Sequence, residues 1–234
     1  KKMAQRIATK SPVVIQKSGS TPTAAVIWCH GLGDGPHGWA SFCKDLSDSL
    51  GGYVKFILPY APEQPVTCNG GMVMPSWMDL VEIPIHITSP DNGLQQMESI
   101  DIINNLVNEV IASGIPAERI VLGGFSQGGA LALASTIKSP LKLGGCCCLS
   151  GWALPKQELE SALPSSASFT SPFLICHGEA DQVVTAPNGP HVANMLSNAG
   201  ANSILKTYPG LPHSMCPEEQ DDVLDFLIKY LPEN

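Results

Sequence analysis

Charge is scarce in this sequence. Charged residues make up 15% of the 234 residues, against roughly 25% in an average domain. Thirteen Lys and Arg against 21 Asp and Glu give a net charge of −8, and basic residues form no cluster. This argues against a nucleic-acid partner and against a polybasic contact with anionic lipid. Since 44% of the residues are hydrophobic, disorder is excluded and one large globular domain is expected.

Long apolar runs are also missing. No stretch approaches the roughly 20 apolar residues that a membrane span requires. Residues 1–16 lack the apolar core of a signal peptide, so we expect no secretory leader.

The cysteine pattern lacks the spacing of known sites. Eight cysteines are present, yet none forms a C-x-x-C pair and none joins histidines at zinc-finger spacing. Cys146, Cys147 and Cys148 lie in the apolar run LGGCCCL, as small buried hydrophobes would. An even count leaves disulfides open, but we expect free thiols and hence a reducing compartment. We expect no metal and no cofactor.

Short apolar runs alternate with segments of helical period, which predicts an α/β fold with a mostly parallel sheet and helices on both faces. Strands are expected at Ala24–Cys29, Val54–Leu58, Arg119–Gly123, Gly144–Leu149, Pro172–Cys176 and Ser203–Tyr208. Helices are expected around Trp39–Leu50, through Ile100–Ile111, and at Gln127–Ile137, Val192–Ala199 and Glu218–Leu231. Residues 1–234 would form one domain, with an irregular excursion from Pro59 to about Asp91.

One motif indicates chemistry. Ser126 is the centre of Gly124-Phe125-Ser126-Gln127-Gly128, which follows an expected strand and precedes an expected helix. This G-x-S-x-G pattern is typical of a nucleophile elbow, where the serine takes strained backbone and its neighbours must lack bulk. The amides that begin the helix point at a developing oxyanion. An ordinary glycine-rich turn is the alternative.

A serine nucleophile needs a base, and the base needs an orienting acid. In this arrangement the chain order is Ser, acid, His, each on a loop at the carboxyl end of a strand. Four acids lie between Ser126 and the last histidine: Glu158, Glu160, Glu179 and Asp181. Asp181 is favoured because it closes a loop after a strand, with Glu179 as runner-up, while Glu158 and Glu160 lie in a polar, surface-like segment.

Two histidines follow Asp181. His213 comes after a strand and the turn Pro209-Gly210-Leu211-Pro212, which places it on a sheet-end loop. His191 is at the head of a helical segment and is the alternative base. Four other histidines are expected to be structural or exposed: His30, His37, His86 and His177.

The second oxyanion donor should come from the loop after an early strand. His30-Gly31-Leu32-Gly33-Asp34 follows AAVIWC, and its glycines let the backbone approach a substrate. We expect the N–H groups of Leu32 and Gln127 to form the oxyanion hole.

From about Val26 to its end, the sequence resembles the acyl-protein thioesterase family, also called the lysophospholipase or small carboxylesterase family. The resemblance rests on HGLGD at 30–34, LPYAP at 58–62, PSWMD at 75–79, GGFSQGGALAL at 123–133 and HGEADQVV at 177–184. It implies an α/β-hydrolase fold, the triad Ser126, Asp181 and His213, and cytosolic cleavage of acyl thioesters on palmitoylated proteins. Esters of lysophospholipids or small acyl compounds are further implied substrates, with transient membrane contact.

Two positions depart from that family's usual pattern. Pro212 stands where glycine usually precedes the histidine, so the loop is expected to be stiffer or tilted. Met78 stands where phenylalanine is commoner, which would change the apolar lining.

Apolar residues on the 60–90 excursion suggest a lid or an acyl groove, because flexible methionines suit chains of variable length. The residues predicted to bind substrate there are Met72, Met74, Trp77 and Met78. A satellite cluster that only packs the loop is the alternative.

The sequence therefore predicts a serine hydrolase that works through an acyl-enzyme. Two alternatives remain: a short-chain carboxylesterase without a protein substrate, and a small-molecule receptor with negligible turnover on the same fold.

Overall fold

The computed structural model describes residues 10–90, 93–153 and 156–233. Two expectations, on a leader within residues 1–16 and on an excursion ending at Asp91, lie partly outside these ranges. In the described part of the chain, no helix is both long enough and apolar enough to cross a bilayer.

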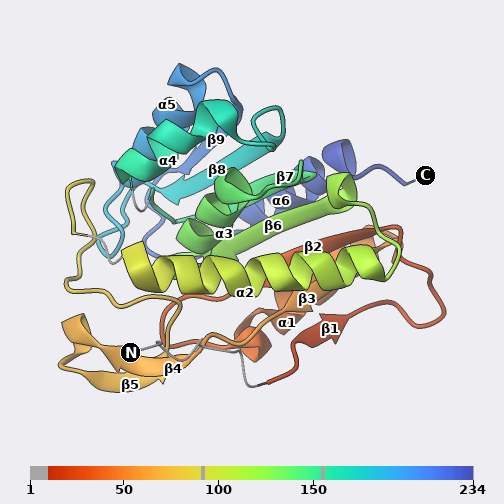
Figure 1. The fold of residues 1–234 in the computed structure, drawn as a ribbon, viewed down its shortest axis with the longest axis horizontal. Coiled ribbons are helices and arrows are strands. Elements are labelled where there is room, and N and C mark those ends of the chain that lie inside the picture. Colours follow the sequence, from red (N-terminus) through yellow and green to blue (C-terminus); the bar gives the residue numbers. More distant parts are fainter. Residues whose placement is uncertain (1–9, 91–92, 154–155, 234) are drawn as a thin grey trace.

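One seven-stranded sheet organises the described chain, in the order β1-β3-β2-β6-β7-β8-β9 (Figure 1). Among the described strands of this sheet, only β1 runs antiparallel to its neighbour. The strands are β1 (Val13–Ile15), β2 (Ala24–Cys29), β3 (Val54–Leu58), β6 (Ile120–Phe125), β7 (Gly145–Leu149), β8 (Pro172–Gly178) and β9 (Asn202–Tyr208), and a separate hairpin pairs β4 (Glu63–Val66) with β5 (Met72–Pro75).

Helices cover both faces of this sheet. Strand β2 is buried along its whole length, and its side chains alternate between two apolar clusters. Ala25 and Ile27 join the cluster under α2 (Gly93–Ala112) and α3 (Gln127–Lys138), whereas Val26 and Trp28 join the cluster under α1 (Ala40–Ser49) and α6 (Pro217–Tyr230). Continuous apolar strands of this kind are typical of a sheet buried on both sides. Helices α4 (Lys156–Ala162) and α5 (Asn188–Asn198) complete the layers.

The predicted α/β architecture is confirmed, and each expected strand and helix is present. Most ends lie within a few residues of the prediction, but α2 begins at Gly93, seven residues before the expected Ile100. Three features were not predicted: the edge strand β1, the β4–β5 hairpin and helix α4. The prediction of free thiols is also confirmed, since all eight cysteines are unpaired. Six are buried, and burial raises the pKa of Cys146 to about 12.

Parallel strands place their carboxyl ends at one edge of the sheet. The loops after β2, β6, β7, β8 and β9 therefore meet there, with the chain that follows β3 beside them. We call this side the catalytic edge and residues 59–90 the excursion.

Candidate active site

Ser126 lies on a strained turn between β6 and α3. Its backbone has φ 56° and ψ −122°, a conformation that non-glycine residues rarely adopt. Gly124 and Gly128 let this turn press against the end of β2, because a Cβ atom there would lie 2.5 Å and 2.1 Å from the carbonyl oxygen of Cys29. The amide of Ser126 donates to Leu149 O at 2.8 Å. Neighbouring strands therefore hold the serine at the catalytic edge.

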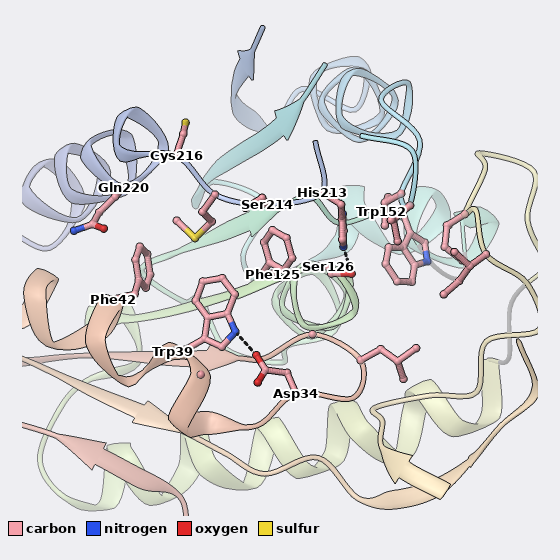
Figure 2. Close-up of a pocket in the computed structure, with 18 of the residues that line it drawn as sticks. Asp34, Trp39, Phe42, Phe125, Ser126, Trp152, His213, Ser214, Cys216 and Gln220 are labelled. Carbon is pink, nitrogen blue, oxygen red and sulfur yellow. Dashed lines mark hydrogen bonds between the residues drawn. The ribbon is translucent and has the colours of Figure 1, made fainter. Parts of the chain in front are cut away.

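Three side chains from three loops form one hydrogen-bonded chain, of which Figure 2 shows the Ser126–His213 part. His213 Nε2 lies 3.0 Å from Ser126 Oγ, and His213 Nδ1 lies 2.7 Å from Asp181 Oδ2. A carboxylate accepts only, so Nδ1 carries the proton and Nε2 is free to accept the serine hydroxyl proton. The structure thus brings together the serine, acid and histidine that the sequence singled out.

Asp181 is held in its charged form. Burial would raise its pKa, but hydrogen bonds from His213 and from the amides of Val183 and Val184 outweigh burial and lower the pKa below its usual value. His177 Nε2 lies 3.5 Å from Asp181 Oδ2, the oxygen that also contacts His213, and 2.9 Å from Val184 O. An ionised Asp181 orients the imidazole and stabilises the positive charge that His213 carries when it takes the serine proton during the reaction.

The alternative acids and base lie elsewhere. Glu179 is exposed and accepts a hydrogen bond from Thr207 Oγ1, and exposed Glu158 pairs with Lys138. Glu160 is exposed on α4, and His191 belongs to the first turn of α5. His37 and His86 are exposed, as expected of non-catalytic histidines.

The loop after β2 lies directly against the elbow. A Cβ atom on Gly31 would be 3.6 Å from Ser126 Cβ, and Gly33 N donates to Pro75 O at 2.9 Å. His30 supports the loop, since its Nδ1 lies 2.8 Å from Gly31 O and its Nε2 accepts from Ala61 N. Burial lowers the pKa of His30, which favours this neutral, structural role.

Within the described ranges, no hydrogen bond from either amide expected to form the oxyanion hole is present. Among the described residues, Leu32 N donates to no backbone carbonyl. Gln127 N is the first amide of α3 and has no partner within the helix. Both flank Ser126 in the chain or in space, so the arrangement suits a carbonyl oxygen that gains negative charge.

A cavity of about 810 Å³ opens around Ser126 and His213, within the usual range for small-molecule sites. It has two lobes. The aliphatic lobe continues one apolar cluster of the sheet, and its lining residues are Leu80, Ile83, Ile85, Trp152, Val183 and Val184. The aromatic lobe continues the other cluster, with Trp39, Phe42, Phe125 and Met215 as its walls and Asp34, Gln220 and Asp221 at its rim. Figure 2 shows Trp152 on one side of the Ser126–His213 pair and Trp39 and Phe42 on the other.

The expected groove lining needs correction, because none of Met72, Met74, Trp77 and Met78 lines this cavity. Trp77 and Met78 are each 1% exposed and belong to the core. The Trp77 indole N–H donates to His30 O at 2.9 Å, which turns the ring beneath the loop rather than toward the cavity. Met72 is 63% exposed on the β4–β5 hairpin, and Met74 Sδ accepts from Asn69.

The side chain of Gln127 has a role that sequence reasoning missed. Its amide nitrogen donates to Met78 O at 2.8 Å, and its amide oxygen accepts from Trp77 N at 2.8 Å. The residue after the nucleophile thereby fastens the excursion to the elbow. A lone glutamine at the start of an apolar helix was the available signal.

A family model described as Phospholipase/Carboxylesterase matches residues 10–231. The chain belongs to this α/β-hydrolase family. Acyl-protein thioesterase 1 of Gibberella zeae is 42% identical over 221 residues, covering 92% of this chain and 94% of the relative. Acyl-protein thioesterase 1 homolog 1 of Dictyostelium discoideum is 39% identical over 221 residues, covering 94% and 96%.

Solved structures agree with this assignment. Arabidopsis thaliana SOBER1 superposes with a TM-score of 0.84 at 34% identity, covering 89% of this chain and 99% of that one. Zea mays acyl-protein thioesterase 2 superposes with a TM-score of 0.82 at 31% identity, covering 94% and 98%. The predicted family is therefore confirmed. Within the described ranges, no three His, Cys, Asp or Glu side chains are grouped as metal ligands.

Proposed function

We propose that the protein hydrolyses acyl thioesters, including those of palmitoylated proteins, together with related carboxylic and lysophospholipid esters. The observation that carries this is the hydrogen-bonded chain Ser126–His213–Asp181. The two amides of the expected oxyanion hole lie beside Ser126, and the aliphatic lobe next to it carries no charge. The acyl-protein thioesterase relatives, which cover nearly the whole chain, support the thioester class.

The reaction needs only this chain and water. Ser126 Oγ bonds to the acyl carbon while its proton passes to His213 Nε2, and the amides of Leu32 and Gln127 hold the oxyanion. The carbon–sulfur bond then breaks, and the leaving sulfur takes the proton from His213. Water attacks the acyl-enzyme with His213 again as base, which releases the carboxylic acid and restores Ser126.

We propose the aliphatic lobe as the acyl site. Its six lining residues include no charged or hydrogen-bonding terminus apart from the Trp152 indole, so an alkyl chain would lose no polar contact there. Residues 80–85 of the excursion supply Leu80, Ile83 and Ile85, and Ile85 forms an isolated parallel bridge with Val184 outside the main sheet. The excursion thus forms the outer wall of the acyl site.

We propose that the protein acts in the cytoplasm and touches membranes transiently. The β4–β5 hairpin supports this, because Met72 and Val73 are each 63% exposed at its tip. An apolar tip without a polybasic surface suits brief contact with the bilayer interface, where acylated substrates reside.

The test is a substrate panel with a matched inactive variant. Thioesters and oxygen esters from acetyl to palmitoyl, with an S-palmitoyl peptide and a lysophospholipid, are offered to the wild type and to Ser126→Ala. The wild type should label with a fluorophosphonate probe and turn over thioesters of long acyl chains. Preference for acetyl with no peptide hydrolysis would indicate the short-chain carboxylesterase, and labelling without turnover would indicate the receptor.

A further inference from the structure

The aromatic lobe of the cavity has a continuous wall of rings that leads to His213. Trp39 lies 5.5 Å from Phe42 and 5.3 Å from Phe125 between ring centroids, and Phe125 lies 4.8 Å from His213. These rings come from α1, from the turn before it and from the end of β6. Large ring faces beside the base suit a flat or cationic group.

A carboxylate is fixed beside this wall. Asp34 Oδ2 accepts from the Trp39 indole N–H at 3.0 Å (Figure 2). Its other oxygen lies against Gly38, where an added Cβ would be only 2.5 Å away. The carboxylate keeps this position because residue 38 has no side chain. Asp34 is exposed, so its charge faces the lobe and solvent.

A second carboxylate, Asp221, lies at the rim on the first turns of α6. Among the residues that the structure describes, the cavity lining includes no lysine and no arginine. Among the described residues, neither Asp34 nor Asp221 forms an ion pair. The aromatic lobe therefore offers ring faces and two negative charges without a positive partner. The residues of the aliphatic lobe carry no charge.

The two parts of a thioester substrate differ in chemistry, so each suits a different lobe. An acyl chain gains most from a surface without charge, which the aliphatic lobe supplies. The leaving sulfur must reach the proton on His213, and the remainder of its molecule then extends over Phe125 toward Trp39 and the acidic rim.

We propose that the aromatic lobe binds the leaving peptide and selects acylated cysteines flanked by lysine or arginine. This rests on the proposed thioesterase function and adds the charge of its substrate. A cationic side chain there packs over Trp39 or Phe42 and faces Asp34 and Asp221. A choline headgroup carries a cation too, but its phosphate comes first along the molecule and meets the same carboxylates.

The experiment uses two S-octanoyl peptides that differ only in two lysines or two glutamines beside the acylated cysteine. The ratio of their kcat/KM values reports charge selection. The wild type should prefer the lysine peptide by roughly five- to tenfold at 20 mM salt, the scale of one or two partly solvated charge contacts. The ratio should shrink at 500 mM salt because exposed charges are screened.

Three variants locate the effect. Asp34→Asn with Asp221→Asn should bring the ratio close to one, and asparagine at 34 still accepts the Trp39 hydrogen bond. Gly38→Ala should lower the ratio without changing any charge, because its methyl group displaces the Asp34 carboxylate. Asp225→Asn, on the exposed face of α6 and outside the cavity lining, should keep the wild-type ratio.

Equal hydrolysis of both peptides by the wild type would overturn the inference alone. If Asp225→Asn lowered the ratio as much as the double variant does, the inference would also be overturned, because the net charge of the protein would then account for the preference. If the double variant slowed only lysophosphatidylcholine, the lobe would be a headgroup site. Hydrolysis of neither peptide, with small esters still cleaved, would overturn the proposed thioesterase function itself.

Discussion

The catalytic edge and the excursion are built in different ways, although they meet at the same cavity. Backbone sterics hold the catalytic edge, where Gly124 and Gly128 press the elbow onto β2 and strand ends deliver Asp181 and His213. The excursion depends in addition on long-range side-chain hydrogen bonds, such as those from Gln127 to Trp77 and Met78. A backbone contact that only glycine allows leaves a short glycine motif in the sequence, whereas the hydrogen bonds of one glutamine side chain leave little trace in it.

The largest effect is expected at the catalytic edge. Ser126→Ala should lower kcat by about 10⁴-fold or more, because the nucleophile is lost while the oxyanion amides remain. The elbow strain is a backbone feature, so the melting temperature should stay near that of the wild type. Steady-state kinetics with a thermal melt checks both, and near-normal turnover in the folded variant would end the serine mechanism.

The choice of acid is tested by a matched pair on one loop. Asp181→Asn should lower kcat by about 10³- to 10⁴-fold, because the amide cannot stabilise an imidazolium and favours the wrong tautomer. Glu179→Gln removes the same charge from an exposed side chain that contacts Thr207, and should cost less than about threefold. The reverse order of effects would show that the other acid serves His213.

Much of the catalytic edge was predictable and much of the excursion was not. The G-x-S-x-G motif between a strand and a helix identified Ser126, and chain order then selected Asp181 and His213. For Trp77 the sequence gives no direction, because an irregular loop has no period that assigns side chains to a face. The strand β1 has only three residues, and β4 includes Pro65, so neither shows a strand pattern.

Substitutions at Trp77 distinguish a role in the core from a role in the cavity. Trp77→Ala should lower the free energy of unfolding by about 3–5 kcal/mol, the usual cost of removing a buried aromatic side chain. Trp77→Phe keeps an aromatic side chain but leaves His30 O without its indole donor, and should cost about 1–2 kcal/mol. Chemical denaturation measures both. A stable Trp77→Ala protein with selectively weakened long-chain turnover would return Trp77 to the acyl site.

Glu219 should make the stability of the folded protein depend on pH. This carboxyl is fully buried in the first turn of α6, and burial, together with the charge of Asp222, raises its pKa to about 8. Between about pH 4.5 and 8 the folded protein keeps a proton that the unfolded chain releases. Stability should therefore fall as pH rises through this range, by up to about 1.4 kcal/mol per pH unit.

Glu219→Gln preserves the neutral shape and should remove that decline, so the variant should melt higher than the wild type at pH 8 and equally at pH 5. Asp181 acts in the opposite sense, since its lowered pKa contributes stability that is lost only in more acidic solution. Glu218→Gln, exposed one residue earlier, is the control. Parallel stability curves for the wild type and Glu219→Gln would show that the carboxyl is already ionised.

The smallest effect is expected at the outer wall of the acyl site. Ile83 lines the cavity yet is 43% exposed, so Ile83→Ala should change stability little. Each methylene that enters the lobe is worth up to about 0.8 kcal/mol, and kcat/KM should therefore climb from acetyl to octanoyl thioesters in the wild type. In Ile83→Ala the octanoyl value should drop roughly threefold while the acetyl value holds, because an acetyl group is too short to reach the excursion.

Val81→Ala is the matched control, since Val81 is 46% exposed on the same segment and does not line the cavity. Equal slopes in all three proteins would mean that the alkyl chain takes another path, and the excursion would then only pack against the sheet.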